Sequence, residues 1–343
     1  MNDNDLKANA GQTLEANSTD VEETHHPADM TSMPTVLTNT GTGGDGPAGN
    51  VPTRSRWRRW GLVVIDILLF VAFHMVLTVA LMAPFFIKSL AKEGEIHKSP
   101  HFIIQELISL VTGLAAVYIV LRIRRLPWSG VGLTLRAHWR DFGAGILLAV
   151  ALYAVGFGIC LATGSVGVTG CHFSLADQAM SLLLFLMVAI YEETVSRGFL
   201  LGRMIDGGVH RLWALLLSSL LFSSMHLMNP NFALLPFINI VLAGILLGAS
   251  YIYTRNLALP IALHWFWNYL QGPILGFEVS GTRLTKDMLT LRLSGSDLIS
   301  GGNFGFEGSL TCTVLMLLAI AGVMAWKRRE EKCHNRSEAS EGN

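Results

Sequence analysis

Charged residues are scarce in this chain of 343 residues: Asp, Glu, Lys and Arg make up 15%, whereas hydrophobic residues make up 51%. Soluble globular domains carry about 25% charged residues, so the composition argues against a soluble protein. Acidic and basic residues balance at 25 each, and no basic face with interleaved aromatic residues is present. We therefore expect no nucleic-acid partner and favour a protein with several membrane-spanning helices, whose partners include the lipid bilayer.

The common signatures of metal, thiol and serine chemistry are also missing. The four cysteines include no C-x-x-C pair, so the sequence indicates neither a cysteine zinc site nor a disulfide framework. No histidine is followed by glutamate, which excludes the H-E-x-x-H helix of many zinc proteases, and no G-x-S-x-G elbow occurs. Carboxylate and imidazole are nevertheless ordinary zinc ligands, so spacing alone leaves a zinc site open. We expect no cofactor.

Long apolar runs follow a polar amino-terminal segment. Residues 1–53 are rich in Thr, Asn, Gly and Asp, and we expect a disordered tail there and a short carboxy-terminal tail at 332–343. The membrane domain, residues 54–331, contains eight apolar runs: about 60–87, 101–121, 142–163, 179–197, 212–227, 233–253, 258–271 and 309–326. Because about 20 apolar residues cross a bilayer as a helix, the sequence predicts an all-α polytopic membrane protein with about eight transmembrane helices.

The basic residues predict how the chain is oriented. If the amino terminus is inside, the inner connections hold Arg54, Arg56, Arg58, Arg59, Arg122, Arg124, Arg125, Arg136, Arg140, Arg203, Arg211, Arg255, Lys327, Arg328, Arg329 and Lys332. The outer connections hold Lys88, Lys92, Lys98, Arg283, Lys286 and Arg292, diluted by acidic residues. By the positive-inside rule, we expect an integral protein of the inner or plasma membrane with both termini cytoplasmic. A long outer loop then runs from Gly272 to Gly308.

Two adjacent carboxylates, Glu192 and Glu193, stand at the end of the fourth apolar run. A charged side chain in the bilayer costs about 2.5–3.5 kcal/mol even on lenient insertion scales, so such residues usually mark function. Glu193 and Arg197 are four residues apart on a helix and are predicted to form an ion pair, while Glu192 projects about 100° away. Asp66, His74 and Asn239, which also lie in apolar runs without a motif, are interpreted as packing or cavity-lining residues.

Further polar residues occur in two later runs. His226 stands near the end of the fifth run, and His264 and Asn268 are four residues apart in the seventh. A pocket that received these three side chains and Glu192 would contain a general base, a second group able to hold water and two hydrogen-bond donors. Those groups are required for hydrolysis of an acyl bond by activated water. The prediction therefore includes an intramembrane catalytic cavity.

Glu192 and His226 can lie at the same depth in the membrane only under one of two conditions. His226 would lie about 21 Å along the fifth helix, whereas Glu192 should be nearer the inner face. Either the fourth helix continues to about Gly202, or the fifth is tilted or begins later. The Met228-Asn229-Pro230-Asn231 segment would permit a submerged helix end.

Three motifs in order resemble a known family. Glu192-Glu193-x-x-x-Arg197, Phe222-x-x-x-His226 and His264-x-x-x-Asn268 are similar to the signature motifs of the CPBP family, which comprises type II CAAX prenyl endopeptidases and the Abi or lysostaphin-resistance-protein-A-like proteins. The resemblance covers roughly residues 140–271, the predicted protease core. It implies an eight-helix intramembrane endopeptidase whose cavity opens toward the cytosolic side and the lipid, and whose partner is a peptide or protein substrate at the membrane.

The resemblance also implies roles for single residues. Glu192 would activate the water with His226, His264 and Asn268 would form the oxyanion hole, and Glu193 and Arg197 would support the first motif. It favours a mechanism without a metal. Which of the two glutamates is the base stays open.

Two other classes of function stay open as well. One is a catalytically silent membrane protein that acts by binding, for instance in immunity. The other is a proton-coupled transporter, which would also use intramembrane Glu and His, although no repeat of the motif-bearing segments occurs in the two halves.

Overall fold

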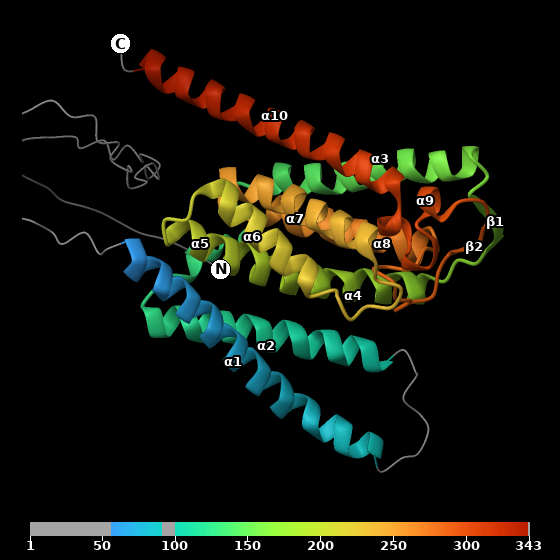
Figure 1. Ribbon diagram of the computed structural model, residues 1–343, viewed down its shortest axis with the longest axis horizontal. Coiled ribbons are helices and arrows are strands. Elements are labelled where there is room, and N and C mark those ends of the chain that lie inside the picture. Colours follow the sequence, from blue (N-terminus) through green and yellow to red (C-terminus); the bar gives the residue numbers. More distant parts are fainter. Residues whose placement is uncertain (1–55, 91–99, 342–343) are drawn as a thin grey trace, which may run out of the picture. The chain divides into compact units, whose positions relative to one another are not determined.

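Each of the eight apolar runs forms a helix in the computed structural model, which describes residues 56–90 and 100–341 (Figure 1). The helices are α1 (Arg56–Leu90), α2 (Pro100–Arg124), α3 (Trp139–Ala162), α4 (Leu175–Glu193), α6 (Arg211–Ser224), α7 (Leu234–Thr254), α8 (Ala258–Tyr269) and α10 (Leu310–Glu341). The all-α class is confirmed. The tail predicted at 1–53 lies outside the described residues.

Helix length and composition identify fewer membrane spans than the eight that the sequence predicts. Within the described ranges, five helical segments are long and apolar enough to cross a membrane, and they lie in α1, α2, α3, α4 with its continuation, and α7. Helix α6 and the apolar part of α10, Leu310–Trp326, are shorter apolar helices. These spans make the chain an integral membrane protein, while the figure of eight transmembrane helices stays a prediction.

Helix α4 continues past the predicted run. A π-helix, η2 (Thr194–Leu201), and a short helix, α5 (Gly202–Asp206), extend it without a break, so one span runs over Leu175–Asp206. At ~1.5 Å per residue, Glu192 lies about 21 Å from Asp206, and His226 lies about 22 Å from the start of α6. The first of the two predicted alternatives is therefore correct, because the longer fourth helix brings Glu192 to the depth of His226.

Small residues let the helices approach one another. A Cβ on Gly145 of α3 would meet the Leu259 carbonyl oxygen of α8 at 2.7 Å, and one on Gly244 of α7 would meet Ser219 of α6 at 2.7 Å. Such close contacts are typical of helix packing in membranes, where van der Waals contact replaces the hydrophobic effect between helices. Helices α3 and α8, α6 and α7, α7 and α10, and α4 and α8 pack in this core.

The segment predicted as the long outer loop is folded. It contains the strand β2 (Leu289–Leu293), the short helix α9 (Asp297–Ser300) and the turns η4 (Gly302–Phe304) and η5 (Phe306–Gly308). Strand β2 pairs antiparallel with β1 (Val166–Cys171), which follows α3, and the pairing is irregular between Val168 and Gly170. The sequence did not predict this two-stranded sheet.

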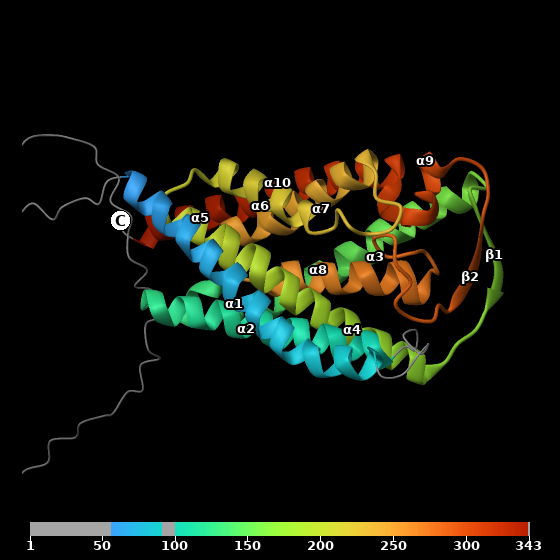
Figure 2. The ribbon, with the colours of Figure 1, turned by 60° about the horizontal axis from the view of Figure 1, so that its bottom comes forward.

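The described helices have two distinct ends, as both ribbon views show (Figures 1 and 2). The arginine-rich end contains the start of α1, the end of α2 and α5, where Asp66 forms ion pairs with Arg124 and Arg203 at 2.9 Å each. Arg255 pairs with Asp206 at this end, at 2.7 Å. The loop end contains β1, β2, α9 and the start of α4.

The three polar residues interpreted as packing residues have interhelical partners. Asp66, which is fully buried, joins α1 to α2 and α5 through the two ion pairs above. His74 Nε2 and the Tyr191 hydroxyl are hydrogen-bonded at 3.1 Å, which joins α1 to α4. Asn239 of α7 donates to the carbonyl oxygens of Glu307 and Ser309, just before α10.

Candidate active site

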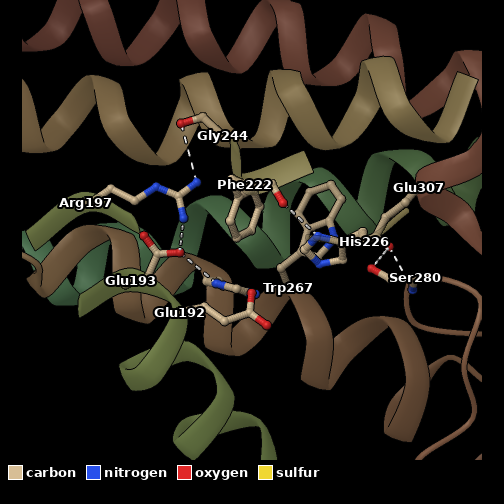
Figure 3. Close-up of polar contacts among 10 residues, drawn as sticks. Glu192, Glu193, Arg197, Phe222, His226, Gly244, Trp267, Ser280 and Glu307 are labelled. Atoms are coloured by element: carbon tan, nitrogen blue, oxygen red, sulfur yellow. Dashed lines mark hydrogen bonds and ion pairs between the residues drawn. The ribbon is translucent and has the colours of Figure 1, made fainter. Parts of the chain in front are cut away.

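A buried ion pair lies where α4 passes into η2. Arg197 donates from one guanidinium nitrogen to Glu193 Oε1 at 2.6 Å, and these two side chains are 2% and 0% exposed (Figure 3). The predicted pair at i, i+4 is therefore present. Arg197 also donates to the Gly244 carbonyl oxygen of α7 at 3.5 Å, and its guanidinium lies 4.2 Å from the centre of the Phe222 ring. These contacts compensate a charge whose burial would otherwise cost several kcal/mol.

His264 of α8 lies between the two glutamates. Its Nδ1 is 2.8 Å from Glu193 Oε1, and its Nε2 is 3.8 Å from Glu192 Oε2. The first distance is a hydrogen bond and the second is a longer electrostatic contact. Glu193 thus holds both Arg197 and His264. Sequence reasoning anticipated the contact with Arg197 but not the one with His264, because nothing in the spacing of two separate helices reveals which glutamate meets the imidazole.

His226 stands in a turn and not in a helix. Helix α6 ends at Ser224, and the His226 N–H donates to the Ser223 carbonyl oxygen, so the predicted run to Leu227 was too long. Pro230 follows soon after, and proline disfavours the helical conformation in the residue before it. His226 Nδ1 is 3.0 Å from the Phe222 carbonyl oxygen. A carbonyl oxygen only accepts, so Nδ1 carries the hydrogen and Nε2 of a neutral ring keeps its lone pair.

Phe222 organises the three polar side chains around it. Its ring contacts the Arg197 guanidinium on one face and meets the His226 and His264 rings edge-on, with ring centres 5.1 and 6.2 Å away. Aromatic pairs at these separations favour edge-to-face geometry. The first residue of the Phe222-x-x-x-His226 motif therefore fixes the positions of residues from α8 and η2 as well as that of its own histidine.

A cavity of about 380 Å³ brings the candidate residues together. Glu192, His226, His264 and Asn268 line it, as predicted for the pocket, while Glu193 and Arg197 lie behind this lining and support His264. The remaining walls come from α2, α7, α10 and the loop, and include Phe102, Gln105, Glu106, Ile240, Leu246, Trp267, Ser280, Thr282, Leu284, Glu307 and Met316. Glu106 is a second carboxyl group in the cavity beside Glu192, and the sequence offered no motif that singles it out.

A segment of the loop, which we call the strap (residues 278–284), closes part of the cavity. Glu307 accepts hydrogen bonds from the Trp267 indole at 3.0 Å and from the Ser280 N–H and hydroxyl at 2.9 and 2.7 Å. Asn229 donates to the Ser280 carbonyl oxygen at 2.9 Å. Trp267 thus lines the cavity and, through Glu307, anchors the strap. The sequence did not predict that Ser280 and Glu307 would anchor the strap, because loop residues show no hydrophobic periodicity.

In the part of the chain that the structure describes, no group of three or more His, Cys, Asp and Glu side chains is placed so that it could hold a metal ion.

The candidate residues fall within a segment that matches a known family. The family model for type II CAAX prenyl endopeptidase Rce1-like proteins matches residues 174–270, from the start of α4 to just past the end of α8. This match confirms the resemblance to the CPBP family and, at the level of the family, supports intramembrane proteolysis. All six predicted site residues lie inside it, whereas the strap and the wall from α2 lie outside. No curated protein and no solved structure matches the chain.

Proposed function

We propose that this chain is an intramembrane endopeptidase that hydrolyses a peptide bond with water activated by Glu192 and His226. The observation that carries the proposal is the meeting of Glu192, His226, His264 and Asn268, from three separate segments, in one cavity. The match of this segment to an endopeptidase family supports the same class of reaction. Hydrolysis of an amide needs a base, a polarised carbonyl and a proton for the departing amine, and these residues supply all three.

Glu192 and His226 act on the water. Glu192 is half-buried, and its Oε2 accepts no hydrogen bond from the described residues, so this oxygen is free to take a proton from water. The lone pair of His226 Nε2 points away from the bonded Nδ1 and accepts a second hydrogen of the same water. The water attacks the carbonyl carbon, and the proton held by Glu192 then passes to the nitrogen of the leaving amine.

His264 and Asn268 stabilise the oxyanion that forms in this attack. Asn268 donates from its amide. His264 donates from Nε2 when both ring nitrogens carry hydrogen, and the positive charge of that ring faces the carboxylates of Glu193 and Glu192. Glu193, held by Arg197, fixes the ring orientation through Nδ1. Removing one donor of an oxyanion hole typically lowers kcat by about 10²–10³-fold.

The test is cleavage of a peptide library by the purified protein in detergent. Glu192→Ala, His226→Ala and His264→Ala are each expected to abolish cleavage, and His172→Ala, an exposed histidine after β1, serves as the matched control. Activity retained in Glu192→Ala would refute the mechanism. A wild-type protein that cleaves nothing but moves a solute across vesicles would instead support a transporter.

A further inference from the structure

The cavity extends toward one end of the described helices. Its lining comes from the start of α2, the turn after α6, the start of α10 and the strap, which lie toward the loop end, and from the middle of α7 and parts of α4 and α8 (Figures 1 and 2). Glu192 is the lining residue nearest the arginine-rich end on the α4–α5 span, and it is still about 21 Å from Asp206 at ~1.5 Å per residue. Leu175, at the loop end of the same span, is about 26 Å from Glu192 at that rise, so Glu192 lies near the middle of the span and the rest of the cavity extends from it toward the loop end.

The basic residues are divided unequally between the two ends. Among the described residues, the loop end holds Lys88 near the end of α1, Arg283, Lys286 and Arg292, and Arg283 is paired with Glu278 and Asp287. Lys286 in turn lies 3.5 Å from Asp177. The arginine-rich end holds eleven arginines, at the starts of α1, α3 and α6, at the end of α2 and in the connection after it, in α5 and just after α7, with only Asp66, Asp141 and Asp206 near them. Basic residues in short connections are retained on the cytoplasmic side, while acidic residues contribute little to orientation.

We propose that the catalytic cavity faces the extracytoplasmic side of the membrane and that its substrate is a membrane-anchored polypeptide that reaches the cavity from that side. The substrate class rests on the proposed function. The family resemblance implies a cavity that opens toward the cytosol. In this structure the cavity extends toward the loop end, whereas the arginines lie at the opposite end of the helices. The cavity and the arginines therefore cannot both face the cytosol. The arginines decide between them, since orientation follows the distribution of basic residues in this chain and not its motifs.

The strap directs the substrate to enter from the side. Glu307 and Asn229 hold Ser280 across the loop end of the cavity, so the end facing water is partly closed. Two large apolar side chains of the lining are exposed, Phe102 at 38% on α2 and Met225 at 48% on the turn after α6. A chain already anchored in the bilayer reaches the cavity between these two elements.

Thiol labelling measures the orientation without requiring activity. Cys171 in β1 is exposed at the loop end, whereas Cys160 and Cys312 are buried. In a Cys333→Ser variant, a membrane-impermeant maleimide added to intact cells is expected to label Cys171. The matched control carries Cys171→Ser, Cys333→Ser and Leu135→Cys, which places a thiol on an exposed residue in the connection between α2 and α3. It is expected to react only after the cells are permeabilised. The opposite pattern overturns the proposal.

Cleavage in sealed vesicles measures the side of the active site. A water-soluble quenched peptide, selected from the library above, is expected to be cut by right-side-out vesicles at least tenfold faster than by inside-out vesicles, and detergent should equalise the two rates. Faster cleavage by inside-out vesicles overturns the proposal. If no peptide is cut even in detergent, the proposed function fails, and the maleimide pattern still decides which way the cavity faces.

Discussion

Substitutions of the two adjacent glutamates should have different effects on stability and on activity when both are measured on the same variants. Glu193 is fully buried and bonded to Arg197 and His264, whereas Glu192 is half-buried and its Oε2 accepts no hydrogen bond from the described residues. Breaking a buried ion pair by removing one partner costs about 3–5 kcal/mol, because the other charge stays buried. We therefore expect Glu193→Gln to lower the free energy of unfolding by about that amount.

The prediction for Glu192 is the reverse. Glu192→Gln removes no buried ion pair and should change the free energy of unfolding by less than about 1 kcal/mol. A general base contributes about 10²–10⁴-fold to the rate, so kcat should fall by that factor in Glu192→Gln. Thermal unfolding in detergent, followed by the fluorescence of the eight tryptophans, gives the first quantity, and the peptide cleavage assay gives the second.

A double substitution tests the cause of the instability. In Glu193→Gln combined with Arg197→Met, neither charge remains, so most of the stability lost in Glu193→Gln should return. Activity should not return with it, because His264 has lost its ionic partner. The reasoning is refuted if Glu192→Gln destabilises the protein as much as Glu193→Gln does, or if Glu193→Gln keeps both normal stability and normal kcat.

Three further predictions concern the strap, the absence of a metal from the mechanism and the loop. Glu307→Gln places an amide hydrogen against donors from Trp267 and Ser280, so it should destabilise the protein by about 1–3 kcal/mol and alter KM more than kcat. Unchanged kinetics and unfolding would contradict an anchored strap, and Glu278→Gln is the matched control. Chelators should leave cleavage unaffected; loss of activity that zinc restores would contradict the proposed mechanism. Burial raises the pKa of Asp287 from 3.8 to about 6, against the opposing effect of Arg283. The folded protein therefore binds more protons than the unfolded chain between these values, so stability should increase as pH falls from about 7 to 4. Asp287→Asn should remove that dependence, and an unaltered pH profile of unfolding would contradict it.

Local spacing was sufficient for the parts of the site that belong to one helix. Eight apolar runs marked eight helices, because hydrophobic length is a property of consecutive residues. The ion pair between Glu193 and Arg197 followed from a separation of four residues, and a π-helix in this region did not break it. The shared cavity for Glu192, His226, His264 and Asn268 was likewise expected, but only from the kinds of chemistry these side chains perform together.

Contacts between distant segments could not be predicted in the same way. The bond from His264 to Glu193, and not to Glu192, depends on the rotation of α8 against α4, which the spacing within either helix does not determine. The placement of His226 in a turn depends on where α6 ends, and helix ends are weakly encoded. Glu307 and Ser280 meet through a loop without periodicity, so neither residue differed in sequence from an ordinary polar loop residue.

Motif spacing and membrane orientation are independent properties of this sequence, and the site depends on both. The motifs determine which side chains meet, since Glu192, His226 and His264 would form the same cavity whichever way the helices crossed the bilayer. The arginines at the other end of the α4–α5 span determine which side that cavity faces. Transferring basic residues from the connections after α2 and α5 to the loop end should therefore reverse the accessible side while the catalytic contacts persist.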